Sequence, residues 1–262
     1  MSKVSKVKFN NDLKGAISKA VSEIGGFGKF VKEGETVFLK PNFNTADPFP
    51  ASTDPEFLKA VVKLVLQENP KKVIIGDSCT MSENTRQVMN KLGIFELEKM
   101  DQRIEVIPFD EHEWLKKEIP KGKYLKKVSI PKILDQVDKL ILLPCVKTHF
   151  IAKFTGSLKL QVGIMKPSQR MFLHFINVQG KIADLNTIVH PDLIIMDARK
   201  CFVTRGPSEG LVKEPNLILA SESRVSTDIE GVKIIQSYPE NCLNIKPEEL
   251  PQIKRAKELG IK

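Results

Sequence analysis

The chain has 262 residues, of which 41% are apolar and 28% charged, and its formal net charge is +9. This composition is typical of a globular protein, and no run reaches the roughly 18 apolar residues that a membrane-spanning helix requires. Residues 1–14 lack the apolar core of a signal peptide, so we expect a cytoplasmic protein without a membrane partner.

The cysteines, at positions 79, 145, 201 and 242, are too far apart to form a CxxC pair. The chain therefore has no intrinsic iron–sulfur or zinc-ribbon motif, and we expect buried, reduced thiols. The cofactor is left open, and a divalent metal held by distant residues remains an alternative. Lysines are concentrated in residues 116–132, but one aromatic residue and no arginine accompany them, which favours a solvated hairpin or loop over a nucleic-acid site.

Strand and helix patterns alternate through the first half of the chain. Apolar runs and turn residues predict strands at 4–9, 35–40, 72–75 and 104–108, and apolar periodicity predicts helices at 10–24, 53–69 and 84–92. Asn10 or Asn11 is the expected cap of the first helix, and Thr53 or Asp54 that of the second, with Pro55 as its first residue. This alternation predicts right-handed βαβ crossovers and a parallel sheet.

The second half of the chain continues the pattern. We expect an antiparallel ribbon at 122–128, a short helix at 132–137, a buried strand at 140–146 and a helix that begins at Thr155-Gly156-Ser157. Further helices are expected at 179–189, 226–237 and 246–259, with strands at 193–197 and 216–220. Ser226, Thr227 or Asp228 is the expected cap of the helix at 226–237. The predicted fold is a single α/β domain over residues 1–262, with a mostly parallel, Rossmann-like sheet flanked by helices and a small antiparallel ribbon.

Polar residues follow several predicted strands at the point where each strand ends. They are Lys40 with Asn42, Asp77, Lys147 with His149, and Asp197. In an open α/β sheet the carboxyl ends of strands line the ligand crevice, so these residues are expected to meet at one site. Lys147 and His149 are two residues apart, which in a strand places both side chains on the same face.

The polar residues allow functional and structural interpretations. Lys40, Lys147 and Lys159 could neutralise an anion, with Asn42 donating a hydrogen bond, although most lysines are simply solvated. Amides and hydroxyls of Thr155, Gly156 and Ser157 could bind the same anion, or the segment could be an ordinary helix start. The backbone around Gly206 and Gly210 could form an anion-binding nest.

Acidic and histidine residues complete the candidate site. His149 and His174 are candidates for proton transfer, and Lys147 is grouped with them as catalytic; either histidine could instead be structural. Asp77, Asp197 and Asp228 could orient lysines, cap helices or hold a divalent metal.

Several sequence islands, in this order, resemble the family catalogued as domain of unknown function 362. They are VFLKPNFN (37–44), VIIGDS (73–78), LPCVKTHFIAKFTGSLKLQVGIMK (143–166), LHFIN (173–177), IADL (182–185), LIIMDA (193–198), GPSEG (206–210) and ILASESRVSTDIEGV (218–232). The resemblance covers residues 35–237 and implies an α/β fold, in a family whose activity is unsettled. Family members are often associated with ferredoxin-like iron–sulfur modules, which implies a ferredoxin-like protein as a candidate partner.

These observations lead to one functional hypothesis and one alternative. The first is an α/β enzyme that acts on a small anionic molecule, a carboxylate or a phosphorylated compound, through lysine charge and histidine proton transfer. The alternative is a non-catalytic module that carries a cofactor or docks an iron–sulfur protein.

Overall fold

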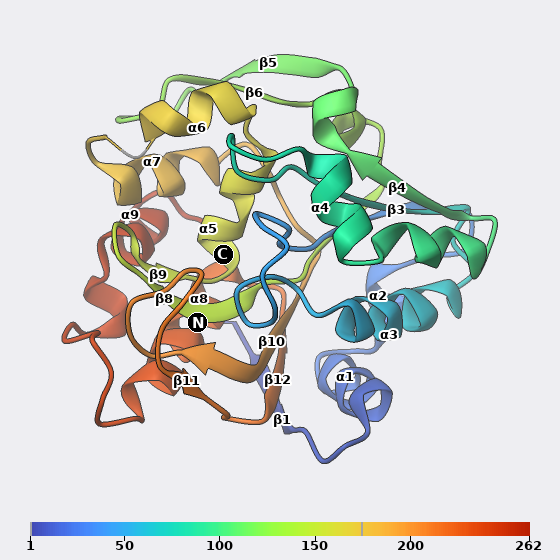
Figure 1. The fold of residues 1–262 in the computed structure, drawn as a ribbon, viewed down its shortest axis with the longest axis horizontal. Coiled ribbons are helices and arrows are strands. Elements are labelled where there is room, and N and C mark those ends of the chain that lie inside the picture. The colour runs from blue at the N-terminus through green and yellow to red at the C-terminus, as the bar shows by residue number, and fades with distance from the viewer. Residues whose placement is uncertain (1, 174) are drawn as a thin grey trace.

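The computed structural model describes residues 2–173 and 175–262. A mixed sheet runs through the middle of the molecule in the strand order β1-β12-β10-β7-β2-β3-β4 (Figure 1). These strands are β1 (Val4–Lys8), β2 (Thr36–Lys40), β3 (Lys72–Asp77), β4 (Ile104–Pro108), β7 (Lys139–Leu142), β10 (Leu193–Phe202) and β12 (Leu217–Ser221).

The centre of the sheet is parallel and its order is that of a Rossmann fold. β2, β3, β4, β7 and β10 pair in parallel, whereas β12 and then β1 add an antiparallel edge. If the five parallel strands are numbered along the chain, their order across the sheet is third, second, first, fourth, fifth. The direction of strand addition therefore reverses between β2 and β7. That reversal leaves a crevice at the carboxyl ends of these two strands, where α/β proteins bind ligands.

Helices cover both faces of the sheet. One face carries α1 (Leu13–Ser22), α2 (Phe27–Phe30), α3 (Pro55–Leu66) and α4 (Thr85–Lys91), followed by the 3₁₀ turn η1 (Ile94–Lys99). The other face carries α5 (Ser157–Leu160), α6 (Pro167–Leu173), α7 (Val178–Leu185), α8 (Arg224–Gln236) and α9 (Pro251–Glu258). Shorter 3₁₀ turns are η2 (Phe109–Glu111), η3 (Lys132–Asp135), η4 (Gln161–Ile164) and η5 (Pro247–Glu249).

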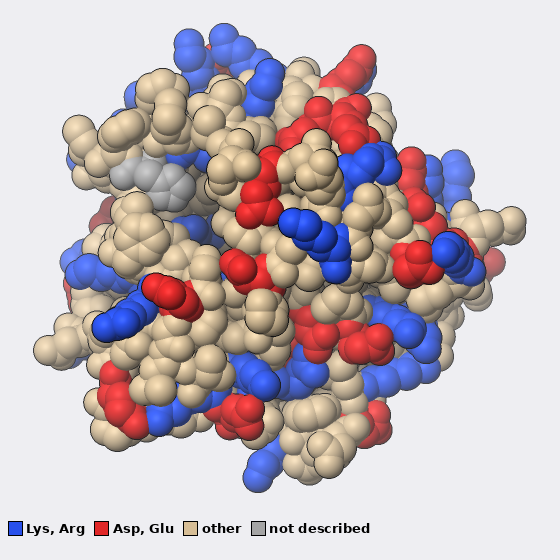
Figure 2. All heavy atoms as spheres, viewed as in Figure 1, with Lys and Arg blue, Asp and Glu red and all other residues tan. Residues whose placement is uncertain are grey.

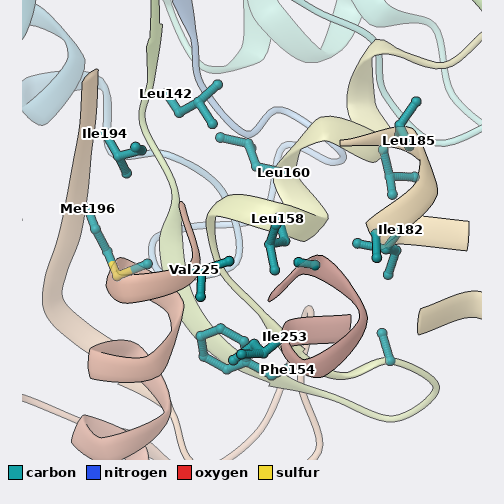
Figure 3. Packing of buried hydrophobic residues seen from close by; sticks show 14 of the residues in the cluster. Leu142, Phe154, Leu158, Leu160, Ile182, Leu185, Ile194, Met196, Val225 and Ile253 are labelled. Atoms are coloured by element: carbon teal, nitrogen blue, oxygen red, sulfur yellow. The ribbon is translucent and has the colours of Figure 1, made fainter. Parts of the chain in front are cut away.

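The two helical layers bury alternate residues of the same strands. In β2, Val37 and Leu39 belong to the core beneath α1–α4, whereas Phe38 belongs to the core beneath α5–α9. This follows from the period of two in a strand, which sends successive side chains to opposite faces. Figure 3 shows the second core, where leucines of α5 lie against side chains from the sheet. Lys40 has the same parity as Phe38 and therefore ends β2 on the α5–α9 face.

Short strands extend the architecture outside the main sheet. β8 (Cys145–His149) pairs with β10 and with β9 (Lys153–Thr155), and β11 (Val212–Lys213) pairs with β10. β5 (Trp114–Glu118) and β6 (Lys127–Pro131) form the separate antiparallel ribbon, which is wider than the predicted 122–128. The lysine-rich segment 116–132 is this ribbon with its connecting loop.

Two predicted element ends were wrong for identifiable reasons. Asn11 has a left-handed φ of 64°, and the Asp12 side chain instead caps α1 by accepting from the Gly15 amide at 2.9 Å. Ser223 caps α8 by accepting from the Ser226 amide at 3.0 Å, so the predicted cap residues, including Asp228, lie inside the helix.

The strand predicted at 140–146 is two strands. β7 ends at Leu142, because Pro144 has no amide hydrogen with which to continue the ladder, and β8 begins at Cys145. Lys147 and His149 therefore lie within β8 rather than beyond a strand end. β10 also runs to Phe202, which places Asp197 in the middle of a strand. The helix α6 was not predicted.

Candidate functional site

A cavity of about 460 Å³ opens at the carboxyl ends of β2 and β3, beside the point where the strand order reverses. This volume suits a small organic ligand. Its charged lining residues come from different elements: Lys40, Asp77, Lys147, Lys159 and Arg170, together with His149. Four of these side chains are basic and one is acidic.

Lys40 and Asp77 form a buried ion pair at the floor of the cavity. Lys40 Nζ lies 2.7 Å from Asp77 Oδ1 and donates to the carbonyl of Pro41 at 2.7 Å. Asp77 also accepts from the amides of Phe43 at 2.6 Å and of Ser78 at 2.8 Å. Burial lowers the pKa of Lys40, and the charge of Asp77 opposes that change. Asp77 therefore already accepts from one ammonium and two backbone amides.

Gly163 in η4 makes room for this pair. A Cβ atom at Gly163 would lie 2.6 Å from Asp77 Oδ1 and 2.8 Å from Lys40 Nζ, closer than real Cβ contacts come. The glycine at position 163 is thus required by the packing of distant residues against it rather than by its own backbone. Sequence reasoning did not select Gly163, because a glycine beside a turn has many local explanations.

Lys147 reaches the cavity from β8. Its ammonium donates to the carbonyl of Ala51, which also accepts from the Asn42 side-chain amide at 2.9 Å. Burial lowers the pKa of Lys147 to about 8, against the opposing influence of Cys145 and Asp47. An ammonium has three donors, so two of them remain for a ligand. Asn42 and Lys147, which the sequence predicted to be neighbours, thus donate to the same carbonyl oxygen.

Lys159 reaches the cavity from α5 and is the least compensated charge in it. The residue is partly exposed, and within the described part of the chain its ammonium has no hydrogen bond or ion pair. Burial, and then the charges of Lys147 and Arg170, lower the pKa of Lys159 to about 7. Near neutral pH this lysine can therefore both release and accept a proton.

His149 has its ring orientation fixed by the backbone that follows it. Nδ1 accepts from the amides of Ile151 at 3.1 Å and Ala152 at 3.2 Å. An amide can donate only to an unprotonated nitrogen, so the ring proton lies on Nε2. His149 is therefore arranged as a donor through Nε2 rather than as a base at Nδ1.

Arg170 of α6 is a lining residue that sequence reasoning missed. Its guanidinium donates to the carbonyls of Met165 at 2.9 Å, Ser78 at 3.0 Å and Cys79 at 2.9 Å, and also to the Ser78 hydroxyl. It thus ties the end of β3 to the start of α6 while adding a buried positive charge. Pro167, at the first turn of a helix, was the available sequence signal for α6.

The amides at the start of α5 are already occupied. Asp228 Oδ1 accepts from the Ser157 amide at 2.5 Å, and Oδ2 accepts from the Leu158 amide at 3.0 Å. Ser157 therefore does not offer its amide to a ligand, contrary to the prediction. Gly156 is required because a Cβ there would lie 2.4 Å from Asp228 Oδ1. Burial raises the pKa of Asp228 to about 6, and these hydrogen bonds oppose the rise.

Thr155 is the part of this segment that reaches the cavity. Its hydroxyl is buried and lacks a hydrogen-bond partner among the described residues. A buried hydroxyl without a partner costs free energy, which a ligand could recover.

Other predicted site residues lie elsewhere. Asp197 pairs with Arg199, with 2.6 Å between Asp197 Oδ2 and the guanidinium, and does not line the cavity. A Cβ atom added at Gly206 would lie 2.1 Å from the carbonyl oxygen of Thr148, and one at Gly210 would lie 1.9 Å from that of Thr204. These two glycines therefore shape the loop whose Pro207 and Ser208 line the cavity. His174 lies outside the described residues.

Across residues 2–173 and 175–262, no three His, Cys, Asp or Glu side chains form a group that could hold a metal ion. Cys79, Cys145 and Cys201 are buried free thiols, whereas Cys242 is exposed, contrary to the prediction.

Within the same described residues, no helix has both the length and the apolar character needed to cross a bilayer. On the face in Figure 2, basic and acidic side chains are interspersed.

The fold and cavity together define a Rossmann-type α/β protein with a cationic pocket at its switch point. The chain belongs to the family described as domain of unknown function (DUF362), whose sequence profile matches residues 37–233. This agrees with the resemblance seen in the sequence.

Two more distant similarities accompany the family match. The chain is 26% identical over 252 residues to a thylakoid-associated protein from Synechocystis sp., covering 91% of this chain and 72% of that protein. A lactate racemase apoprotein from Thermoanaerobacterium thermosaccharolyticum superimposes with a TM-score of 0.46 and 11% identity. That superposition covers 88% of this chain and 61% of the racemase chain, so the chain spans less than two thirds of the racemase's length.

Proposed function

We propose that this protein is an enzyme that binds a small anionic organic molecule, a carboxylate or a phosphorylated compound, and transfers a proton to or from it. The observation that carries the proposal is the Lys159 ammonium, which lines a cavity of about 460 Å³, has no partner among the described residues and has a pKa of about 7.

The charges around the cavity favour an anion. Asp77 is matched by Lys40, whereas Lys147 and Lys159 form no ion pair within the described part of the chain and add positive charge to the lining. Like charges that share a desolvated site repel one another, and each favours the neutral form of its neighbour. A bound anion would relieve this repulsion and would raise the pKa values of both lysines.

The donors divide into binding and proton-transfer groups. Lys147 is anchored on the Ala51 carbonyl, so it is suited to hold an anionic group at a fixed position. Lys159 has a pKa close to neutrality and is suited to exchange a proton. His149 lines the same cavity, with its ring oriented by the amides of Ile151 and Ala152. In this scheme Lys159 takes the acid–base role that the sequence suggested for histidine.

Anion binding to matched lysine variants tests the proposal. We would measure dissociation constants for acetate and for inorganic phosphate by calorimetry at pH 7, using Lys159→Met and Lys147→Met. Lys166→Met is the control, because Lys166 is an exposed lysine that does not line the cavity. Loss of one charge-assisted hydrogen bond should weaken binding by about 10- to 100-fold. Unchanged binding in both cavity variants would show that the site is assigned incorrectly.

A further inference from the structure

The cavity lining has an apolar part, here called the apolar wall, that includes both buried and exposed residues. Its apolar residues are Ala51, Phe150, Ile151, Leu160, Val162 and Pro207. Leu160 and Val162 are only 5% and 6% exposed, whereas Ile151 is 36% and Phe150 is 74% exposed. The apolar wall thus includes both buried side chains and the exposed aromatic ring of Phe150.

The turn that carries Phe150 is held in place by its backbone. Phe150 lies between β8 and β9, and its amide donates to the carbonyl of Gly206 at 3.1 Å. Gly206 in turn packs against Thr148, and its amide donates to the Thr148 hydroxyl at 3.1 Å. The Phe150 ring stacks on the His149 imidazole, with ring centroids 5.1 Å apart and an angle of 19° between the planes. A large apolar side chain is therefore fixed beside a site residue with most of its surface in water.

We propose that the ligand is amphipathic: its anionic group lies against Lys147 and Lys159, and its apolar portion covers Phe150 and Ile151. This inference rests on the proposed function and adds the class of molecule that the site selects. Phe150 is then a specificity-determining residue. The physical reason is that covering its exposed ring removes apolar surface from water, which a small polar anion cannot do.

Two homologous series of anions test this inference. Straight-chain carboxylates from acetate to octanoate, and monoalkyl phosphates of the same chain lengths, would be titrated calorimetrically into the full chain. For the wild type, each methylene that reaches the apolar wall should tighten binding by about fourfold. The series whose members bind more tightly identifies the preferred anionic group.

Substitutions at two exposed phenylalanines provide the matched comparison. Phe150→Ala should flatten the dependence on chain length while the protein still binds acetate, and Phe150→Leu should retain most of that dependence. Phe172→Ala is the control, because Phe172 is 63% exposed but does not line the cavity. It should leave both series unchanged. Both phenylalanines are mainly exposed, so their truncation should preserve folding, which circular dichroism would verify.

The outcomes separate this inference from the proposed function. If acetate and octanoate bind the wild type equally, or if Phe150→Ala and Phe172→Ala have the same slopes, the ligand is not selected by the apolar wall. If Lys159→Met and Lys147→Met both leave acetate binding unchanged, or if neither series binds at all, the anionic cavity itself is refuted. Octanoate binding that survives Lys159→Met undiminished would show nonspecific apolar association and would also overturn the inference.

Discussion

Replacing Lys159 with methionine should stabilise the protein, and the effect should depend on pH. An ordinary lysine has a pKa of 10.5, whereas the pKa of Lys159 is lowered to about 7. The native state therefore disfavours the charged form, by at most about 5 kcal/mol at about 1.4 kcal/mol for each tenfold change in proton affinity. Lys159 is partly exposed at the cavity, and water there reduces the cost. We expect Lys159→Met to raise the free energy of unfolding by about 1–3 kcal/mol at pH 6.

The sign of the pH dependence follows from the two protonation states. Below pH 7 both native and unfolded chains carry the proton, and the full cost is present in the native state. Between pH 7 and 10.5 the native lysine is neutral while the unfolded one still binds a proton, so the cost falls as pH rises. The stabilisation by Lys159→Met should therefore shrink steadily from pH 7 towards pH 10.

Urea unfolding at pH 6, 8 and 10 measures this effect. Lys166→Met serves as the control, since Lys166 is exposed and should show no comparable pH-dependent gain. A gain that is the same at all three values, or a destabilisation at pH 6, would refute the description of Lys159 as an uncompensated, desolvated charge.

Three further predictions concern the cavity and the residues that support it. Acetate affinity should fall at least tenfold from pH 7 to pH 9, as measured by calorimetry, because Lys159 and Lys147, with pKa values of about 7 and 8, lose their protons while acetate stays ionised. Asp228→Ala should lower the free energy of unfolding by about 2–4 kcal/mol, because two buried amides at the start of α5 lose their acceptor, and Asp228→Asn should cost less. Gly163→Ala should cost about 1–3 kcal/mol, because its Cβ would overlap the buried ion pair beside it. Urea titrations measure both stability changes.

Each of these predictions has a contradicting result. Acetate affinity that is level up to pH 9 would mean that neither lysine binds the anion. An Asp228→Ala variant as stable as the wild type would mean that the two amides find other acceptors. A Gly163→Ala variant with unchanged stability would mean that η4 can shift away from the ion pair at little cost.

Much of the architecture followed from local patterns. Apolar runs located the central strands, and the alternation of strands with helices predicted the mostly parallel sheet that the structure shows. Lys40 and Asp77 could be placed together because the carboxyl ends of neighbouring parallel strands meet at one edge. The cap of α3 by Asp54, with Pro55 as the first helical residue, was also correctly among the predicted alternatives.

Interactions between distant residues decided the rest. Asp228 is 71 residues from Ser157, so nothing local could show that its carboxylate occupies the amides at the start of α5. Arg170 reaches the end of β3 only because α6 packs there. The sequence by itself determined which polar residues follow which strands, because side-chain period and strand composition are local properties. Only the tertiary structure decided which of them share the cavity and that Lys159 titrates near neutrality, because burial and the charges of Lys147 and Arg170 exist only in the folded chain.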